Sequence, residues 1–511
     1  MFNVVKPENL TDRLDADFYK KDFIQNEKTL IECGSSRLSE LIDLKKSGYG
    51  VLPKSNEYLE QGGVYLIRGG DLSFGAISIP KIRVPFKYKN DKGTTQVGDV
   101  LILIKGACID GPEGVAIISP NERGYVFNGS CYRLCFVNKE IDSHFFIAYS
   151  QSTYFLKQKK RWVANTGISY NDESSIKGYL LPKFSQNVKA YIGDKIRQAE
   201  SLNQWAKSIE LAANKLFIEK IDVLGYVERK SEKTGWATLE NRLDPVYYNK
   251  LYSFFGDNWF IENSKPLTDY ISEGSYGVLP ASNSYGTGDC RFITATDIVE
   301  SNYDSRKYTN VPVEEINKKA EISTGQILLE IKGGINYCVV ATEILDGTYV
   351  NGSVFRFTVK DIDENYLAYY LNSKFKNLYC DRVSVNNIIK YLDQESIYAL
   401  PVLRLGDDIE NKLAYAYRTV QLLNREVFNL TQSAKLLIES LIEGQITEGQ
   451  ITDVQKALED CDNSKEKAIL NKMTDKGYFI EGGKPLFNDL DKLYELLDEA
   501  KKETEVDGEL A

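Results

Sequence analysis

The sequence contains very little histidine, with a single residue, His144, in 511. A metal site built from several histidines is therefore excluded, and a triad of the serine-hydrolase type would have to use His144. The glycine-rich loop GxxxxGK[ST], which binds phosphate in many nucleotide hydrolases, is missing. The aromatic tetrapeptide with paired prolines that marks adenine methyltransferases is missing too. The common catalytic and nucleotide-binding motifs are thus not found.

The eight cysteines form no CxxC pair. Structural zinc sites use four ligands at close spacing, and only Cys131 and Cys135 lie near each other, so no metal is expected. Scattered free thiols fit a reducing compartment. The eight are Cys33, Cys108, Cys131, Cys135, Cys290, Cys338, Cys380 and Cys461.

No apolar run in the sequence is long enough to cross a membrane. The first residues, Met1 to Lys6, do not combine a basic start with an apolar stretch, so no signal peptide is expected. The sequence therefore predicts a soluble, cytoplasmic protein with no membrane partner.

The net charge of −10 is unevenly distributed. Gly444 to Ala511 holds 9 lysines, no arginine and 17 acidic residues, which gives −8. The other 443 residues hold 54 basic and 56 acidic side chains, which gives −2. Because local potential matters more than total charge, a near-neutral body can still present basic surfaces to phosphate.

Two long stretches of the chain repeat in the same order at an offset of about 225 residues, which indicates a duplication. A duplication alone shows ancestry, and functionally it suggests two similar binding surfaces related by a pseudo-twofold axis. The matched segments are Leu14–Tyr19 with Leu243–Tyr248, Tyr49–Pro53 with Tyr276–Pro280, Leu101–Gly106 with Leu328–Gly333, Asn128–Ser130 with Asn351–Ser353, and Ser175–Ile176 with Ser396–Ile397.

Each copy begins with a pattern typical of a mixed α/β domain. Short apolar runs bounded by glycine, at residues 64–67 and 100–104, predict buried strands. Helices are expected at residues 142–160 and, in the second copy, 363–379. A length of 511 residues fits three or four domains of this size.

A long helix with a heptad seam follows each globular part, just after a Leu-Pro pair. Only Lys195 breaks the alternation in the first copy. The seam positions are Val188, Ile192, Ala199, Leu202, Ala206, Ile209, Ala213 and Leu216, then Ile409, Leu413, Ala416, Val420, Leu423, Val427, Leu430, Ala434, Leu437 and Leu441.

Such seams require partner helices, and the simplest partner for each is the other helix of the same chain. About 36 residues of helix extend roughly 54 Å, which would make a rigid spacer between two globular domains. The alternative is that the helices drive homodimerisation.

The order of these parts resembles the DNA-specificity (S) subunits of Type I restriction-modification systems. The resemblance covers residues 1 to 444 and includes local sequence in both copies. It is carried by Tyr65–Leu72, by Gly98–Ile102, by the Leu-Pro pair before each helix and by Leu436–Gly444.

The resemblance implies two target-recognition domains separated by two long antiparallel coiled-coil helices. The boundaries expected are 1–184 and 225–404 for these domains, 185–224 and 405–444 for the spacer helices, and 445–511 for an acidic helical extension. The extension could bind a protein partner or only improve solubility, and its last helix is expected to begin near Asn488.

The resemblance also implies a function: each domain reads one half of a split, asymmetric site in double-stranded DNA. Two methyltransferase subunits carrying S-adenosylmethionine would dock on the helices, and an ATP- and magnesium-dependent restriction subunit would cut unmethylated DNA. The chain itself would hold no cofactor and no catalytic residue.

One motif suggests an enzyme instead. Glu330-Ile331-Lys332 at a strand end, with Asp297 upstream, resembles the magnesium site of many nucleases. The repeat places Leu103 opposite Glu330, so a contact to phosphate or base by Lys332 is the better interpretation.

Candidate DNA contacts are polar and basic residues in loops, since such side chains bind base edges and phosphates. A solvated helix end is the alternative for the basic run that includes Lys157, Lys160 and Arg161. The candidates in the first copy are Tyr49, Lys54, Ser55, Asn56, Arg68, Lys105, Lys157, Lys160, Arg161, Asn165 and Tyr170. Those in the second copy are Tyr276, Ser282, Asn283, Tyr285, Lys332, Asn336, Asn386, Asn387 and Lys390.

Three other functions stay open from the sequence: a DNA-targeting subunit of another phage-defence complex, a magnesium-dependent nuclease, and a coiled-coil scaffold that binds no nucleic acid.

Overall fold

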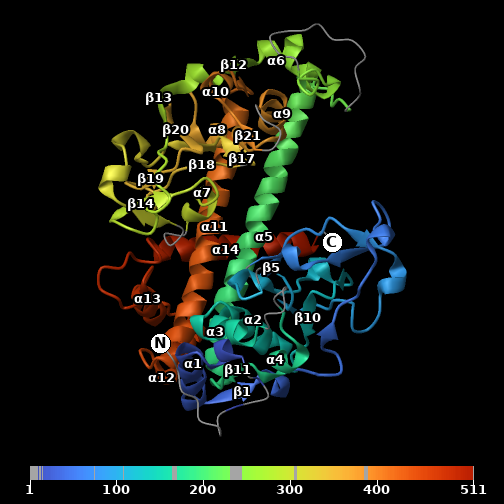
Figure 1. Cartoon of the computed structure of the whole chain (residues 1–511), viewed down its shortest axis with the longest axis vertical. Coiled ribbons are helices and arrows are strands. Elements are labelled where there is room, and N and C mark those ends of the chain that lie inside the picture. The colour runs from blue at the N-terminus through green and yellow to red at the C-terminus, as the bar shows by residue number, and fades with distance from the viewer. Residues whose placement is uncertain are drawn as a thin grey trace. The chain divides into compact units, whose positions relative to one another are not determined.

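The computed structural model describes residues 10, 13, 15–73, 75–106, 109–163, 170–230, 244–303, 308–335, 337–384 and 389–509. They fall into two units that mix helices and strands, as predicted (Figure 1). Unit 1 comprises Met1–Glu200 and Asn429–Tyr494, and unit 2 comprises Ser201–Phe428 and Glu495–Ala511.

A four-stranded antiparallel sheet forms the centre of unit 1, in the order β2-β10-β7-β8. The apolar run predicted at residues 100–104 forms β7, whose four residues are all buried. A smaller sheet has the order β6-β3-β9. The strands are β2 (Gly48–Tyr49), β10 (Cys131–Leu134), β7 (Val100–Leu103), β8 (Val115–Ile117), β6 (Arg83–Val84), β3 (Val64–Ile67) and β9 (Val126–Phe127).

Unit 2 repeats this arrangement with the same strand order and register. Arg133 of β10 lies opposite Leu101 and Gly48, and Arg356 of β20 lies opposite Leu328 and Ser275. The large sheet has the order β13-β20-β16-β18 and the smaller one β15-β14-β19. The strands are β13 (Ile271–Tyr276), β20 (Val354–Val359), β16 (Ile327–Glu330), β18 (Cys338–Val340), β15 (Thr309–Val311), β14 (Cys290–Ile293) and β19 (Tyr349–Val350).

The prediction of one continuous helix after each sheet is wrong. Residues 142–160 belong to two helices, and the hydroxyl of Ser152 accepts a hydrogen bond from the Phe155 amide at the start of the second. The second copy breaks at the equivalent place, at Asn372 and Ser373, where the serine makes no side-chain cap bond. The helices are α2 (Lys139–Ser150), α3 (Thr153–Trp162), α8 (Glu364–Leu371) and α9 (Lys374–Val383).

The two long helices with heptad seams are present as α5 (Gln186–Val223) and α11 (Asp407–Ile442). In unit 2, Ala213 and Phe217 of α5 share one hydrophobic core with Leu413 and Tyr417 of α11. This is the pairing within the chain that the sequence predicts. The part of α5 in unit 1 also has a buried seam, which includes Val188, Ile192 and Ala199.

The acidic extension is folded and packs on α5 within unit 1, a role that its composition did not indicate. Glu466 is 1% exposed and pairs with Lys195, the residue that interrupts the heptad seam. The hydroxyl of Tyr494 donates a second hydrogen bond to Glu466. The extension comprises α12 (Glu448–Glu459), α13 (Ser464–Leu470), the hairpin of β23 (Met473–Thr474) and β24 (Gly477–Tyr478), and α14 (Leu490–Glu509).

Shorter elements complete the two units. In unit 1 they are α1 (Lys21–Glu32), β1 (Ser35–Arg37), β4 (Leu72–Ser73), β5 (Ala76–Ile77), α4 (Glu173–Gly178) and β11 (Leu180–Pro182). In unit 2 they are α6 (Asn258–Glu262), β12 (Ser264–Pro266), α7 (Ile298–Ser301), β17 (Lys332–Gly333), β21 (Lys390–Tyr391), α10 (Gln394–Tyr398) and β22 (Pro401–Leu403). Among the described helices, none combines the length and apolar character needed to span a membrane.

Candidate nucleic-acid interface

A lysine–glycine loop leaves the end of β7 in unit 1 and brings two predicted DNA contacts together. Lys105 forms an isolated β-bridge with Tyr170, and the Asn171 amide donates to the Ile104 carbonyl at 2.8 Å. Both predicted residues are exposed, and Tyr170 is 39% exposed. They lie at one edge of the sheet, where their side chains are free to meet a ligand in solvent.

The equivalent loop of unit 2 has the same construction. Lys332 and Gly333 form β17, which pairs with β21 so that Gly333 lies opposite Lys390. The Leu392 amide donates to the Ile331 carbonyl at 2.9 Å, as its counterpart does in unit 1. The Lys390 ammonium forms an ion pair with Asp381. Lys332 and Lys390 were predicted separately, and the fold places them side by side.

The motif Tyr-Gly-Val-Leu-Pro, unchanged between the copies, is explained by a close approach of two backbone segments. A Cβ atom on Gly50 would lie 2.2 Å from the Phe127 carbonyl oxygen, and one on Gly277 would lie 2.1 Å from the Val350 oxygen. Only glycine fits such a contact. The turn fixes the preceding tyrosine, and the Tyr49 ring packs edge-on against Tyr132 with centroids 5.2 Å apart.

The leucine of this motif is a residue that sequence reasoning missed. Leu52 is 82% exposed and Leu279 is 72% exposed, although apolar side chains in such repeated segments are usually buried. Each lies beside the glycine of an Asn-Gly-Ser turn, Gly129 or Gly352. One sequence feature could have identified it. The leucine occurs in both copies, although it belongs to no apolar pattern typical of a strand or a helix.

A carboxylate anchors the loop that follows the motif in each unit. Lys54, Ser55 and Asn56 are exposed around a short 3-10 turn that ends at Glu57. Glu57 accepts hydrogen bonds from the Lys87 ammonium and then the Tyr88 hydroxyl, and these bonds lower its pKa to about 2. The carboxylate therefore stays ionised and holds the loop at any ordinary pH.

In unit 2 the anchor is Glu315, which accepts from the Ala281 amide at 3.1 Å and the Ser284 hydroxyl at 2.9 Å. The predicted contacts Ser282 and Asn283 are exposed on this loop. Tyr285, also predicted, packs edge-on against Phe292 with centroids 5.7 Å apart. Tyr276 packs on Phe355, and burial raises its pKa to about 12.

A buried lysine in each unit holds the loop that carries the lysine–glycine pair. The Lys159 ammonium of α3 donates to the Gly111 carbonyl at 3.2 Å, and that of Lys376 in α9 donates to the Ile335 carbonyl at 2.7 Å. Both lysines are 0% exposed. Burial lowers the pKa of Lys159 to about 8 and also lowers that of Lys376. These are positioning contacts for the candidate DNA loops.

The basic run at the end of α3 is not a single exposed surface, so the prediction for Arg161 needs correction. Lys157 and Lys160 are exposed. Arg161 is 8% exposed, donates to the Phe18 carbonyl at 3.0 Å and pairs with Glu27 at 2.8 Å. Its guanidinium faces the interior, because residues three apart share one face of a helix and Arg161 lies on the same buried face as Gln158.

Arg68 is half-buried, and its guanidinium lies 3.8 Å from the Asp71 carboxylate. Four other predicted contacts lie outside the described residues: Asn165, Asn336, Asn386 and Asn387. Apart from that of Arg161, the DNA-binding role of the predicted contacts stays a prediction.

The carboxylates of the nuclease-like motif hold local backbone in place. Glu330 is 3% exposed and accepts hydrogen bonds from the amides of Gly334 and Tyr337. Asp297 accepts from the amide and hydroxyl of Thr294. In the described part of the chain, no group of three or more His, Cys, Asp or Glu side chains could hold a metal ion.

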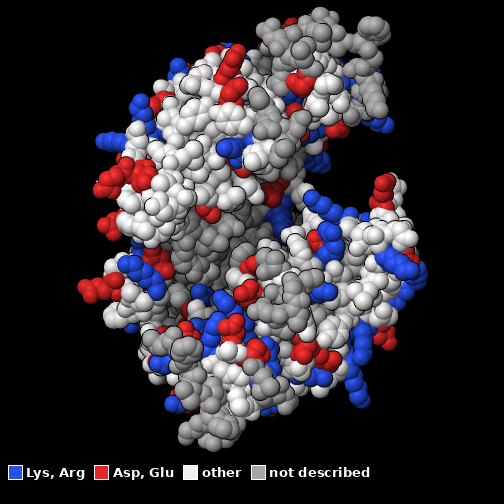
Figure 2. Space-filling view, in the orientation of Figure 1, with Lys and Arg blue, Asp and Glu red and all other residues white. Residues whose placement is uncertain are grey.

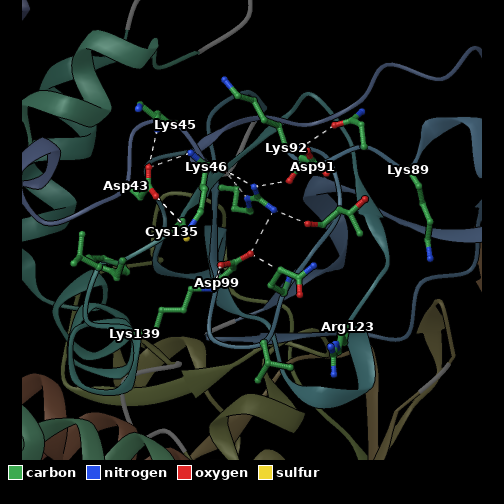
Figure 3. Close-up of a pocket in the computed structure, with 17 residues that line it drawn as sticks. Asp43, Lys45, Lys46, Lys89, Asp91, Lys92, Asp99, Arg123, Cys135 and Lys139 are labelled. Atoms are coloured by element: carbon green, nitrogen blue, oxygen red, sulfur yellow. Dashed lines mark hydrogen bonds and ion pairs between the residues drawn. The ribbon is translucent and has the colours of Figure 1, made fainter.

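A basic cleft of about 1060 Å³ lies at the other edge of the large sheet of unit 1 (Figure 3). Its lining includes Asp99, just before β7, and Arg133 and Cys135 on and after β10. On the face of the molecule in Figure 2, basic and acidic side chains are intermixed, so positive charge is concentrated locally and does not cover a broad face.

No family model matches the sequence, and no curated protein matches it. Solved structures do match. The S subunit of a Type I restriction-modification system from M. genitalium is 12% identical, with a TM-score of 0.39 over 81% of this chain and 96% of its own. The HsdS subunit from Thermoanaerobacter tengcongensis is 13% identical, with a TM-score of 0.28 over 81% and 97%.

A third match belongs to a study of complex assembly and conformational transition in the type I restriction-modification system. It is 12% identical, with a TM-score of 0.29 over 81% of this chain and 98% of its own. The three solved structures come from the same kind of system that the sequence motifs resemble.

Proposed function

We propose that this chain is a sequence-specific DNA-binding subunit that reads a two-part, asymmetric site in double-stranded DNA. Each globular part reads one half, and α5 and α11 hold the two readers at a fixed spacing. The chain itself contributes recognition without catalysis, and chemistry is supplied by partner subunits.

One observation carries the proposal: the same loop construction occurs twice with different side chains around it. Lys105 pairs with Tyr170 in unit 1, and Lys332 pairs with Tyr391 in unit 2, each at the same edge of an equivalent sheet. Two domains that read different half-sites need the same backbone framework with different side chains on it. The framework positions the loops, and the loop side chains contact the bases. The two copies differ at other predicted contacts, since Arg68 of unit 1 aligns near Thr294 of unit 2.

The long helices also offer surfaces for partner subunits. Leu211 and Ile218, seven residues apart on α5, are 71% and 44% exposed, and Tyr415 on α11 is 69% exposed. Exposed apolar side chains at heptad spacing suit a protein interface. The partners proposed are two methyltransferase subunits that bring S-adenosylmethionine, and a restriction subunit that uses ATP and magnesium.

The test is a map of methylated adenines in the source cell, with and without this gene. Loss of a split motif with a fixed gap on deletion supports the proposal and identifies the target. An unchanged map contradicts a methylation-directing role and favours a targeting subunit of another defence complex.

A further inference from the structure

The basic cleft of unit 1 carries positive charge that the chain does not neutralise. Seven lysine and arginine residues and three aspartates line it. Asp99 pairs with Lys139 and Arg133, and Asp43 pairs with Lys46 at 3.4 Å. Among the described residues, no carboxylate forms an ion pair with the four remaining cations. These are Lys45, Lys89, Lys92 and Arg123, all exposed.

A buried arginine builds the cleft by holding two lysine-bearing loops together. Arg133 is 3% exposed and donates to the Lys46 carbonyl at 3.1 Å and the Asp91 carbonyl at 2.9 Å. It also donates to the Thr94 carbonyl. One guanidinium therefore fixes the loop of Lys45 and the loop of Lys89 and Lys92 relative to each other, and all three lysines line the same pocket (Figure 3).

Unit 2 keeps this scaffold and changes its charge. Arg356 occupies the strand position of Arg133, is 4% exposed and donates to the Lys319 carbonyl. The sheet register places Glu273 where unit 1 has Lys46. By the same register, Gln326, just before β16, corresponds to Asp99 before β7. The charges at these two positions of the unit 1 cleft are therefore not kept in unit 2, although the arginine that supports the cleft is duplicated.

We propose that the cleft binds backbone phosphates of duplex DNA beside the half-site read by unit 1. This rests on the proposed function and adds a phosphate-binding site that lies away from the reading loops. Asp99 precedes β7 and Lys105 follows it, and the four residues of β7 rise about 13 Å. That distance equals roughly four base pairs along a duplex.

The size of the cleft and the nature of its cations favour a DNA strand over a small anion. A volume of about 1060 Å³ greatly exceeds the space of one phosphate. Lysines on long flexible stems act as point charges for phosphate and carry no base specificity. The cleft therefore contributes affinity that does not depend on sequence and that falls steeply with salt.

The experiment compares the full chain with the triple variant Lys45→Ala, Lys89→Ala, Lys92→Ala. Binding to a labelled duplex of arbitrary sequence is measured over a range of salt concentrations. Because each phosphate contact contributes about 0.9 to the slope of log K against log salt, the slope is expected to fall by about 2 to 3. Thermal melting of the variant is measured alongside, and the melting temperature is expected to stay at the wild-type value because the substituted side chains are exposed.

The matched control removes three exposed lysines near α1, with Lys20→Ala, Lys21→Ala and Lys28→Ala, and is expected to keep the wild-type slope. A triple cleft variant with the wild-type slope overturns this inference while leaving the proposed function in place. Failure of the wild-type chain to bind DNA at all overturns both. Loss of inorganic tripolyphosphate binding without a change in the DNA slope identifies a site for free anions and also overturns the inference.

Discussion

Leu52 and Leu279 are exposed leucines at the same position of an unchanged motif, beside the candidate DNA loops. We expect Leu52→Ser to weaken specific DNA binding by about 1–2 kcal/mol, because apolar side chains contact thymine methyl groups or base steps at such interfaces. The free energy of unfolding should change by less than about 0.5 kcal/mol, as is usual for exposed positions.

Binding titrations and urea denaturation measure the two quantities for Leu52→Ser and Leu279→Ser. The control is Ile31→Ser, which alters an exposed apolar side chain of unit 1 on α1. Equal loss of binding in the control would mean that the two motif leucines have no special role.

Lys159 gives a pH prediction, because burial lowers its pKa from 10.5 to about 8. Between these values the unfolded chain binds more protons than the folded chain, so this residue makes folding more favourable as the pH rises. The quantity to compare is the free energy of unfolding of the wild type minus that of Lys159→Met. This difference is expected to increase by about 2 kcal/mol between pH 7 and about pH 9.5.

Urea denaturation of both proteins at several pH values tests this, with Lys376→Met as the matched variant of unit 2. The pKa of Lys376 is also lowered by burial, so the same direction is expected there. A difference that stays flat or falls with pH would show that Lys159 is not a buried cation of lowered pKa.

At the scale of elements, the contact between the extension and α5 depends on a buried ion pair. Burial alone would raise the pKa of Glu466, but Lys195 and the neighbouring tyrosine hydroxyls lower it below 4.5 overall. The stabilisation is therefore complete above about pH 4.5 and is lost as the pH falls through the lowered pKa. Lys195→Ala should cost about 3–5 kcal/mol, because it leaves a buried carboxylate without its cation.

Denaturation of Lys195→Ala across acidic pH measures this cost. The control is the double variant Lys195→Met, Glu466→Met, which removes both charges and should keep most of the wild-type stability. An unchanged stability in Lys195→Ala would show that the extension does not depend on this contact.

Elements with a long, regular pattern could be predicted, and short or interrupted ones could not. The heptad seams indicated α5 and α11 because apolar residues repeat over ten positions in α11. The break between α2 and α3 coincides with a serine cap at Ser152, a local signal that competes with a helical apolar pattern. Lys195 was recognised as an interruption, but its partner Glu466 lies 271 residues away and no local pattern connects them.

Some residues of the candidate site could likewise be predicted from the sequence, and others could not. Lysine–glycine pairs at strand ends were visible because the duplication repeats them. The basic cleft was not, because Lys45, Lys89 and Arg123 are far apart in sequence and only the register of β2, β10 and β7 brings them to one place. Arg161 was misassigned because charge alone does not show which helix positions face the interior.

For the whole molecule, the duplication predicts that the two halves of the target are read independently. Lys105→Ala should relax the methylation motif at one position of one half, and Lys332→Ala should relax it in the other half. Loss of a single base-reading contact costs about 1–3 kcal/mol and affects one position, whereas loss of a phosphate contact weakens binding to all sequences.

The gap between the halves should be the same in both variants, because neither lysine belongs to α5 or α11. Methylation maps of cells that carry each variant in place of the wild-type gene provide the measurement, and Lys28→Ala serves as the control of equal charge change. Relaxation of both halves by one substitution would contradict independent reading, since a contact confined to one unit can alter only the bases that this unit meets.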